Sequence, residues 1–287
     1  MDAGKLVICP TPIGNLGDMT LRGLEALRGA DAVCAEDTRV TAKLLAAYDI
    51  KKRVERWDEA TISKGVGAIL ERIAAGQVIV FCSDAGMPGV SDPGSRLVRA
   101  AQDAQVPVEV LPGPTAGVAA YVASGFTCPS FYFGGFFPRK AADRERALAK
   151  LKALDAVLVF YESPNRLVGA LKAVAEALPE REVAICRELT KLHEEVVRGN
   201  ARKVLEEFEQ RAAETSLKGE VVLVIDAPPA QEQERDTAAA LDSAQGRAQE
   251  LMEAGLLSKK DIVSRLQEEF GISRNDAYEI VVCHGDV

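Results

Sequence analysis

The sequence predicts an α/β protein with two α/β domains followed by a small helical segment. Apolar, strand-like runs alternate with amphipathic helical patterns at the start of the chain, and the pattern then becomes mixed. A polar stretch after residue 226 is followed by helical patterns alone. The length of 287 residues also favours more than one hydrophobic core.

The first domain is expected over residues 1–114. Its predicted strands are 5–9, 32–35, 77–82 and 108–111, and its predicted helices lie near 20–29, 40–48, 62–75 and 94–104. Regular alternation of strands and helices is typical of a largely parallel sheet that is covered on both faces.

The second domain is expected over residues 115–226, and a helix at 115–123 connects the two halves. Its predicted strands are 130–137, 156–161, 182–187, 195–199 and 219–226, and its predicted helices lie near 140–153, 164–177 and 200–213. No helix separates the strands at 182–187 and 195–199. They therefore predict a hairpin, which is an antiparallel element.

The C-terminal region is expected to contain a linker at 227–244 and a helical segment at 245–287. Helical patterns occupy about 245–254, 258–270 and 274–283, and Ser273 is placed to cap the last helix. The last two resemble a helix-turn-helix. Because their charges are mixed, packing or dimerisation is a better interpretation than nucleic-acid binding.

Composition excludes several classes of protein. The net charge of −8 argues against binding nucleic acid by bulk attraction, although residues 139–152 concentrate six basic side chains against two acidic ones. That run is either a solvated helix face or an RNA contact. No apolar run is long enough to span a membrane and no signal peptide is evident, so a soluble, cytoplasmic protein is expected.

The six cysteines never form a Cys-x-x-Cys pair, and we expect buried thiols and no metal site. Three catalytic motifs are missing as well. The chain has no phosphate-binding G-x-x-x-x-G-K-[ST], its first turn at 10–18 lacks G-x-G-x-x-G, and no Gly-x-Ser-x-Gly elbow accompanies His193 and His284. P-loop hydrolysis, nicotinamide chemistry and triad hydrolysis are therefore disfavoured.

Two loops of small, turn-forming residues follow predicted strands. One is 83–94, after the strand at 77–82, and the other is 112–117, after the strand at 108–111. In open α/β sheets, ligands bind where strands end and helices begin. We expect these two loops to line one pocket.

Four polar clusters lie at the ends of other elements. Ala35–Arg39 places two carboxylates, a hydroxyl and a guanidinium together. Such a cluster either binds the ribose of a cofactor, or orients a substrate hydroxyl and binds phosphate. The alternative is a helix start that Asp37 or Thr38 caps while Arg39 pairs locally. The second cluster, at 161–166, is a helix start with Pro164 and Ser163, and the third is a charged hairpin tip at 187–194. The fourth, at 134–140, contains Gly, Phe and basic residues. It either stacks on RNA or forms a bulged edge strand.

Seven segments, taken in order, resemble the ribosomal RNA small-subunit methyltransferase I family, a branch of the tetrapyrrole (corrin/porphyrin) methylase superfamily. They are 10–22, 35–39, 83–94, 111–116, 161–164, 187–191 and 218–220, and the match runs from Leu6 to about Ile225. The resemblance implies transfer of a methyl group from S-adenosyl-L-methionine to the ribose 2′-hydroxyl of a cytidine in the decoding region of 16S ribosomal RNA.

The resemblance also implies a fold and a set of contacts. Two α/β domains of the tetrapyrrole-methylase type enclose the cofactor in the cleft between them, the substrate is ribosomal RNA within an assembled 30S subunit, and the protein is a homodimer. The implied cofactor-binding residues are Ile13, Met87, Val90, Thr115, Ala116, Tyr161, Gly219 and Glu220. Two positions depart from the family, because Arg56–Glu59 replaces a His-Asn-Glu-like run and Asn165 stands where histidine is frequent.

For the chemistry, we expect Glu36 or Asp37 to accept the proton of the ribose hydroxyl or to orient it. The residues expected to contact RNA are Asn15, Arg39, Arg139, Lys140, Arg187 and Lys191. One alternative function is a small-molecule (precorrin-type) tetrapyrrole methylase, against which the 35–39 cluster and the basic run after Pro138 argue. Another is an RNA-binding protein that senses the cofactor without catalysis.

Overall fold

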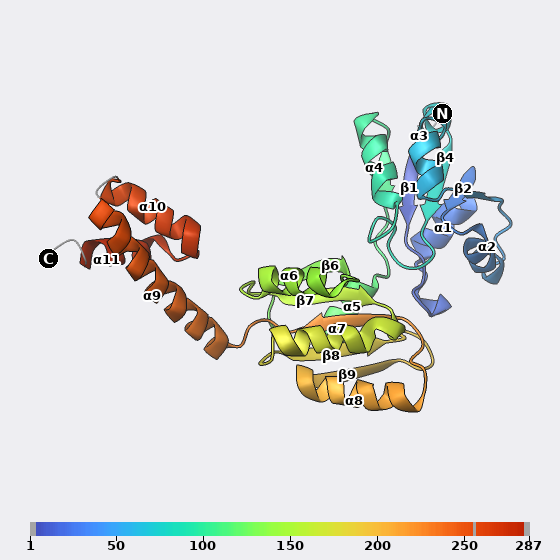
Figure 1. The fold of residues 1–287 in the computed structure, drawn as a ribbon. Coiled ribbons are helices and arrows are strands. Elements are labelled where there is room, and N and C mark those ends of the chain that lie inside the picture. The colour runs from blue at the N-terminus through green and yellow to red at the C-terminus, as the bar shows by residue number, and fades with distance from the viewer. Residues whose placement is uncertain (1–3, 255–256, 284–287) are drawn as a thin grey trace. The chain divides into compact units, whose positions relative to one another are not determined.

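The computed structural model describes residues 4–254 and 257–283, and its first sheet is parallel with helices on both faces (Figure 1). The strands run in the order β3-β2-β4-β1-β5, and every neighbouring pair is parallel, as predicted. The elements are β1 (Lys5–Cys9), η1 (Leu16–Asp18), α1 (Leu21–Gly29), β2 (Ala32–Ala35), α2 (Thr38–Ala47), β3 (Val54–Arg56), α3 (Glu59–Ala74), β4 (Val78–Cys82), α4 (Gly94–Asp103) and β5 (Val108–Val110).

Successive residues of the central strands alternate between two hydrophobic cores. Leu6 and Ile8 of β1 belong to the core that contains residues of α3 and α4. Val7 and Cys9 belong to the core on the opposite face, together with Leu27 of α1 and Leu45 of α2. This alternation follows from the two-residue period of a strand, and it explains why the central strands are apolar throughout.

Strand β3 was not predicted from the sequence. It is a three-residue edge strand that pairs only with β2 among the described strands, and its residues are partly buried or exposed. So short and polar a segment carries no apolar alternation, and tertiary pairing decides its conformation.

The second sheet is mixed, in the order β6-β7-β10-β8-β9. Only β6 and β7 are parallel, and β8 and β9 form the predicted antiparallel hairpin. The pairing of β6 shifts register between Phe133 and Phe136, which confirms a bulged edge strand. The elements are α5 (Ala116–Ser124), β6 (Phe131–Phe136), α6 (Ala141–Leu151), β7 (Val157–Glu162), α7 (Pro164–Ala177), β8 (Glu182–Arg187), β9 (Glu195–Asn200), α8 (Ala201–Glu214) and β10 (Val221–Ile225).

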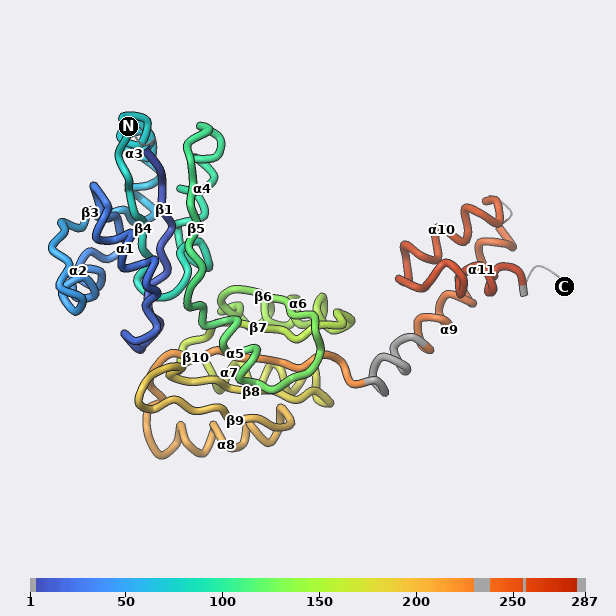
Figure 2. Tube along the Cα trace, turned by 180° about the vertical axis from the view of Figure 1, so that it is seen from behind, coloured from blue at the N-terminus to red at the C-terminus, as the bar shows by residue number. Residues whose placement is uncertain are grey.

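Helix α5 covers one face of the second sheet, where Ala120 packs with Val159 of β7, Cys186 of β8 and Val222 of β10. Helices α7 and α8 lie side by side against the other face, and Figure 2 shows the same layers from behind. The fold therefore consists of two α/β sheets with their helices, as expected.

The C-terminal helices form a core of their own, and contacts divide the chain into two units, 1–147 with 156–226 and 148–155 with 227–287. The helices are α9 (Ala230–Ala254), α10 (Lys259–Phe270) and α11 (Arg274–Cys283). Ser273 accepts a hydrogen bond from the Asp276 amide at 3.1 Å, which confirms the predicted cap.

Most of the stretch expected to be a linker, 227–244, is helical, because α9 already begins at Ala230. The segment is polar but rich in Ala, Gln and Glu, which are strong helix formers. Helix propensity therefore decides the conformation of this polar stretch. Residues 284–287 of the expected helical segment lie outside the described residues.

Candidate functional site

The loops that follow β1 and β4 meet at a switch point of the first sheet. The two strands are neighbours, but the chain leaves β1 toward β2 on one side and leaves β4 toward β5 on the other. Thr11 and Gly86 join the two loops through a pair of backbone hydrogen bonds, each 3.0 Å long. Ligands of open α/β sheets bind in such crevices at the carboxyl ends of the strands.

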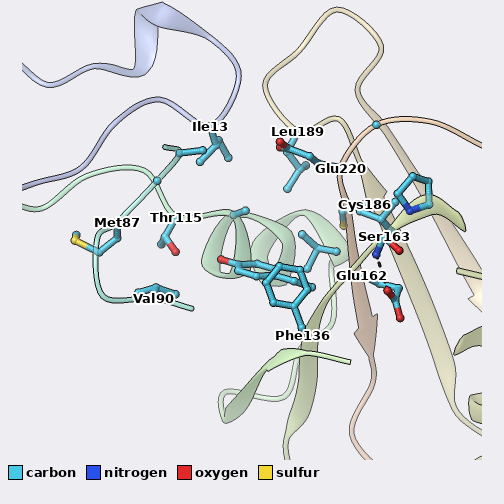
Figure 3. A pocket seen from close by; sticks show the side chains of 18 residues that line it. Ile13, Met87, Val90, Thr115, Phe136, Glu162, Ser163, Cys186, Leu189 and Glu220 are labelled. Carbon is cyan, nitrogen blue, oxygen red and sulfur yellow. Dashed lines mark hydrogen bonds between the residues drawn. The ribbon is translucent and has the colours of Figure 1, made fainter. Parts of the chain in front are cut away.

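The first cavity lies beside these loops and has a volume of about 370 Å³. It is lined by Ile13, Ala85, Gly86, Met87, Val90, Thr115, Ala116, Phe136, Tyr161, Glu162, Ser163, Pro164, Cys186, Leu189, Gly219, Glu220, Val221 and Val222. In Figure 3, Ile13, Met87, Val90 and Thr115 face Phe136 and the residues of the second sheet across the opening. Both loops that the sequence placed at one pocket, 83–94 and 112–117, contribute to it.

All eight residues expected to bind a cofactor line the first cavity. The residues that sequence reasoning did not assign to it include Phe136, Glu162 and Leu189. Glu162 belongs to the 161–166 cluster and Phe136 to the bulged edge, so both lay in segments already marked by their composition. Leu189 carried no signal, because a single leucine in a charged hairpin tip resembles an ordinary packing residue.

Two glycines shape the wall of the first cavity. Gly86 and Gly219 have φ angles of +78° and +93°, in the left-handed region that favours glycine. A Cβ atom on Gly219 would lie 2.6 Å from the carboxylate of Glu188, and one on Gly86 would lie 3.2 Å from Ile13. Both positions therefore require the absence of a side chain.

The hairpin tip between β8 and β9 is held against this wall by Glu188. Its carboxylate accepts hydrogen bonds at 2.8 Å from the backbone amide of Glu220 and from Nζ of Lys191. Lys191 also lies 3.3 Å from Glu220. The hydrogen bond from Lys191 lowers the pKa of Glu188. Burial lowers the pKa of Lys191, but its two carboxylate partners outweigh burial, so the pKa of Lys191 is raised.

Three of the expected RNA contacts already have protein partners. Arg187 pairs with Glu195 and donates to the carbonyl of Lys218 at 2.8 Å. Lys191 is held by its two carboxylates, and Arg39 pairs with Asp37 at 2.6 Å while remaining 86% exposed.

Asn15 caps η1, and its side chain accepts a hydrogen bond from the Gly17 amide. Asn15 and Lys191 line the same shallow groove between the loop after β1 and the hairpin tip. The structure thus brings these two residues together, whereas Arg39 lies at the start of α2.

Arg139 and Lys140 lie just before α6 and are exposed. Among the described residues, neither side chain has an ion-pair partner. Arg144, one turn further along, instead donates to the carbonyl of Pro138 at 2.8 Å and lies over the Phe137 ring. The basic run is therefore partly structural and partly available to a ligand.

The Ala35–Arg39 cluster separates into two different environments. Asp37 caps α2 by accepting the Arg39 amide, and its two oxygens bind the Arg39 guanidinium, which holds the pKa of this carboxyl far below its usual range. The pKa of Glu36 is raised, first by burial and then by nearby carboxylates, of which Asp84 is the strongest. Neither acid lines the first cavity.

Within the residues that the structure covers, no three His, Cys, Asp or Glu side chains form a group able to hold a metal ion. In the same part of the chain, every helix is too short or too polar to cross a bilayer. Cys9, Cys34, Cys82 and Cys186 are buried thiols, and burial raises the pKa of Cys34 and Cys186 to about 12.

Comparison with known proteins gives consistent matches. The sequence profile of the family described as Tetrapyrrole (Corrin/Porphyrin) Methylases matches residues 5–205. Among solved structures, a diphthine synthase superposes with a TM-score of 0.61 at 16% identity, over 77% of this chain and 89% of that one. Uroporphyrin-III-C-methyltransferase from Thermus thermophilus superposes with a TM-score of 0.54 at 22% identity, over 78% and 94%. At these identities the likeness shows the fold.

Curated proteins named Ribosomal RNA small subunit methyltransferase I are similar over most of the chain. The protein of Thermotoga maritima is 42% identical over 222 residues, which are 77% of this chain and 98% of that protein. That of Bacillus subtilis is 40% identical over 78% of this chain and 76% of its own length. For Micromonospora olivasterospora the identity is 37%, over 97% and 87%.

Proposed function

This chain belongs to the tetrapyrrole (corrin/porphyrin) methylase family and, within it, to the ribosomal RNA small subunit methyltransferase I family, and we propose that it methylates the ribose 2′-hydroxyl of a cytidine in the decoding region of 16S ribosomal RNA. The methyl donor is S-adenosylmethionine. The observation that carries the proposal is that the residues assigned to the cofactor from sequence, eight in all, come from segments next to both sheets and line one cavity.

The first cavity fits this cofactor in size and in charge. Its volume of about 370 Å³ lies within the range of small-molecule pockets. Among the described residues that line it there is no Lys or Arg, but there are two carboxylates, Glu162 and Glu220. One oxygen of Glu162 is buried without a hydrogen-bond partner. Carboxylate oxygens on the lining favour a ligand that carries a sulfonium and an ammonium group, and they do so while Glu162 pairs with Arg166 and Glu220 with Lys191 outside the lining.

When bound, the cofactor supplies an electrophilic methyl carbon attached to sulfur. The protein then has to align the ribose hydroxyl and to accept its proton. Of the two acids expected in this role, we assign it to Glu36, because a raised pKa makes a carboxylate a stronger proton acceptor. The carboxylate of Asp37 is engaged by Arg39 and holds its proton weakly.

We expect Gly219→Ala to weaken binding of S-adenosylmethionine at least about tenfold, which corresponds to about 1.4 kcal/mol. The new Cβ would lie 2.6 Å from Glu188 and would force the left-handed backbone to shift the amide that Glu188 accepts. Titration calorimetry measures the effect. Gly67→Ala is the matched control, because nothing lies within 4 Å of a Cβ at that helical position. Equal affinities of the two variants would contradict the assignment.

Binding of RNA is assigned mainly to Arg139 and Lys140, since Arg39, Arg187 and Lys191 must first exchange a protein carboxylate for a phosphate. Asn15 stays in the proposed contact surface through the groove that it shares with Lys191. We further propose that the assembled 30S subunit is the substrate, that the protein is a homodimer and that it acts in the cytoplasm. Replacing the subunits with free 16S RNA tests the first proposal, and light scattering tests the second.

We expect the double variant Arg139→Ala, Lys140→Ala to bind 30S subunits more weakly and with a smaller dependence on salt. Each lost contact to a single-stranded phosphate lowers the slope of log K against log salt by about 0.7. Lys203→Ala on the exposed surface of α8 is the control and should keep the wild-type slope. An unchanged slope in the double variant would remove these residues from the RNA interface.

The decisive experiment incubates the protein with methyl-labelled S-adenosylmethionine and 30S subunits from cells that lack it. We expect label in 2′-O-methylcytidine after digestion of 16S RNA to nucleosides. A parallel incubation with a precorrin tests the small-molecule alternative, and label in the macrocycle instead of RNA would replace this proposal. Stable binding of cofactor and subunits without product would indicate a sensor without catalysis.

A further inference from the structure

A second cavity, here called the α2 cavity, lies on the other side of the paired loops and has a volume of about 430 Å³. It is lined by Thr11, Pro12, Gly14, Leu16, Val40, Thr41, Lys43, Leu44, Ala47, Ser83 and Asp84. The loop after β1 gives Ile13 to the first cavity and Pro12 and Gly14 to the α2 cavity. The loop after β4 likewise divides between Ser83–Asp84 and Ala85–Met87. The two cavities therefore share their walls at the switch point.

Two polar groups in the α2 cavity lack a complete set of partners. Thr41 is 1% exposed, yet its hydroxyl has no hydrogen-bond partner. A buried hydroxyl without a partner is destabilising, so such a group in a native protein calls for a partner that the chain itself does not supply. Asp84 is exposed and accepts the Asp37 amide through Oδ1 at 3.0 Å, which leaves Oδ2 accessible to a ligand in the cavity.

The remaining wall is largely apolar and reaches the surface. Leu16 is 50% exposed and Val40 is 41% exposed, and both line the cavity together with Leu44. Aliphatic side chains at the mouth of a cavity suit a flat, weakly hydrated ring. Proteins that read RNA sequence bind bases that have left the stack and hydrogen-bond their edges.

We propose that the α2 cavity holds the base of the nucleotide whose ribose is methylated, and that Asp84 and Thr41 select cytosine there; the inference rests on the proposed function. The 4-amino group of cytosine donates to Asp84, and the Thr41 hydroxyl donates to an acceptor on the ring. Carboxylates accept from this amino group in nucleic-acid recognition. Uracil would place a carbonyl against the same carboxylate, so the cavity discriminates against it.

This placement agrees with the position of the first cavity. Thr11 of the α2 cavity is bridged to Gly86, which lines the first cavity on the other side of the paired loops, so the two cavities adjoin there. Glu36 is near enough to Asp84 for the charge of Asp84 to raise the pKa of Glu36. The base, the ribose hydroxyl and the proposed proton acceptor thus belong to one region of the first sheet.

The test measures kcat/KM for methyl transfer to 30S subunits that carry cytidine or uridine at the nucleotide that the wild-type protein methylates, which is mapped first. We expect Asp84→Asn to lower the cytidine-to-uridine ratio of kcat/KM by about tenfold or more, because an amide can donate to a carbonyl where a carboxylate cannot. Cofactor affinity, measured by calorimetry, should stay at the wild-type value. Asp103→Asn, an exposed residue paired with Arg99, is the matched control.

Thr41→Val supplies the second test, since valine has nearly the same shape and lacks the hydroxyl. We expect kcat/KM on cytidine subunits to fall about tenfold while the urea midpoint of unfolding is not lowered. Equal losses on cytidine and uridine in Asp84→Asn, or wild-type turnover in Thr41→Val, would overturn the inference alone. Absence of methylated RNA with the wild-type protein would overturn the proposed function and this inference together.

Discussion

Replacing Glu36 with glutamine is expected to lower kcat for methyl transfer by about 10²- to 10⁴-fold, the usual contribution of a general base. Glutamine keeps the size and polarity of the side chain but cannot accept a proton. The cofactor affinity should be retained, because Glu36 does not line the first cavity. Single-turnover kinetics with labelled cofactor and 30S subunits separate the loss of chemistry from any loss of binding.

The pH dependence gives an independent readout of the same residue. Glu36 acts in its deprotonated form, and its pKa is raised by burial and by the charge of Asp84. Activity should therefore fall as the pH drops through this raised pKa, at a higher pH than for an ordinary glutamate. The acidic limb should move to lower pH in Asp84→Asn, which removes one cause of the shift, and should be absent from the residual activity of Glu36→Gln.

Two controls separate the role of Glu36 from a general loss of negative charge. Glu25→Gln makes the same chemical change on the exposed surface of α1 and should leave kcat within a factor of about two. Asp37→Asn tests the neighbouring carboxylate, and asparagine still caps a helix well. A larger loss of kcat in Asp37→Asn than in Glu36→Gln would transfer the role of proton acceptor to Asp37.

The sequence was most informative about segments in which consecutive residues are all buried. The central strands of the first sheet are apolar on both faces because helices cover both, and the pattern alone located β1, β2 and β4. The loops after β4 and β5 could be recognised as candidate ligand loops, because their small, turn-forming residues stand at strand ends, where ligands of open α/β sheets bind. Assigning individual cofactor residues required the resemblance to a family, since most of these residues are small or apolar.

The sequence was least informative about side chains whose ion pairs and hydrogen bonds join segments that are distant in the chain. Nothing in the segment 187–194 shows that Arg187 pairs with Glu195 or that Lys191 is held by Glu188 and Glu220. Thr41 is likewise one polar residue in an amphipathic helix, and only its surroundings show that its hydroxyl is buried without a partner. Contacts between distant segments carry no local pattern, so the α2 cavity could not be predicted.

Truncating Glu162 to alanine is expected to cost about 3–5 kcal/mol in the free energy of unfolding, the largest stability effect predicted for this protein. The Glu162 side chain is fully buried, and one of its oxygens accepts hydrogen bonds from the Ser163 amide at 2.6 Å and from Arg166 at 2.7 Å. Alanine would leave the guanidinium of Arg166, which is 24% exposed, without its carboxylate. Urea unfolding measures the loss as a lower midpoint.

The size of this effect depends on burial, and an exposed ion pair on helix α6 provides the comparison. Asp143 and Arg146 on α6 form an ion pair whose side chains are 41% and 74% exposed, so Asp143→Ala should cost only about 0–1 kcal/mol. Glu162→Gln should fall between the two, because an amide oxygen still accepts from Ser163 and Arg166 but carries no charge. Unfolding of Glu162→Ala and Asp143→Ala at the same urea concentration would contradict a stabilising role of the buried pair in the wall of the first cavity. Pro164 and the start of α7 would then position Ser163 without it.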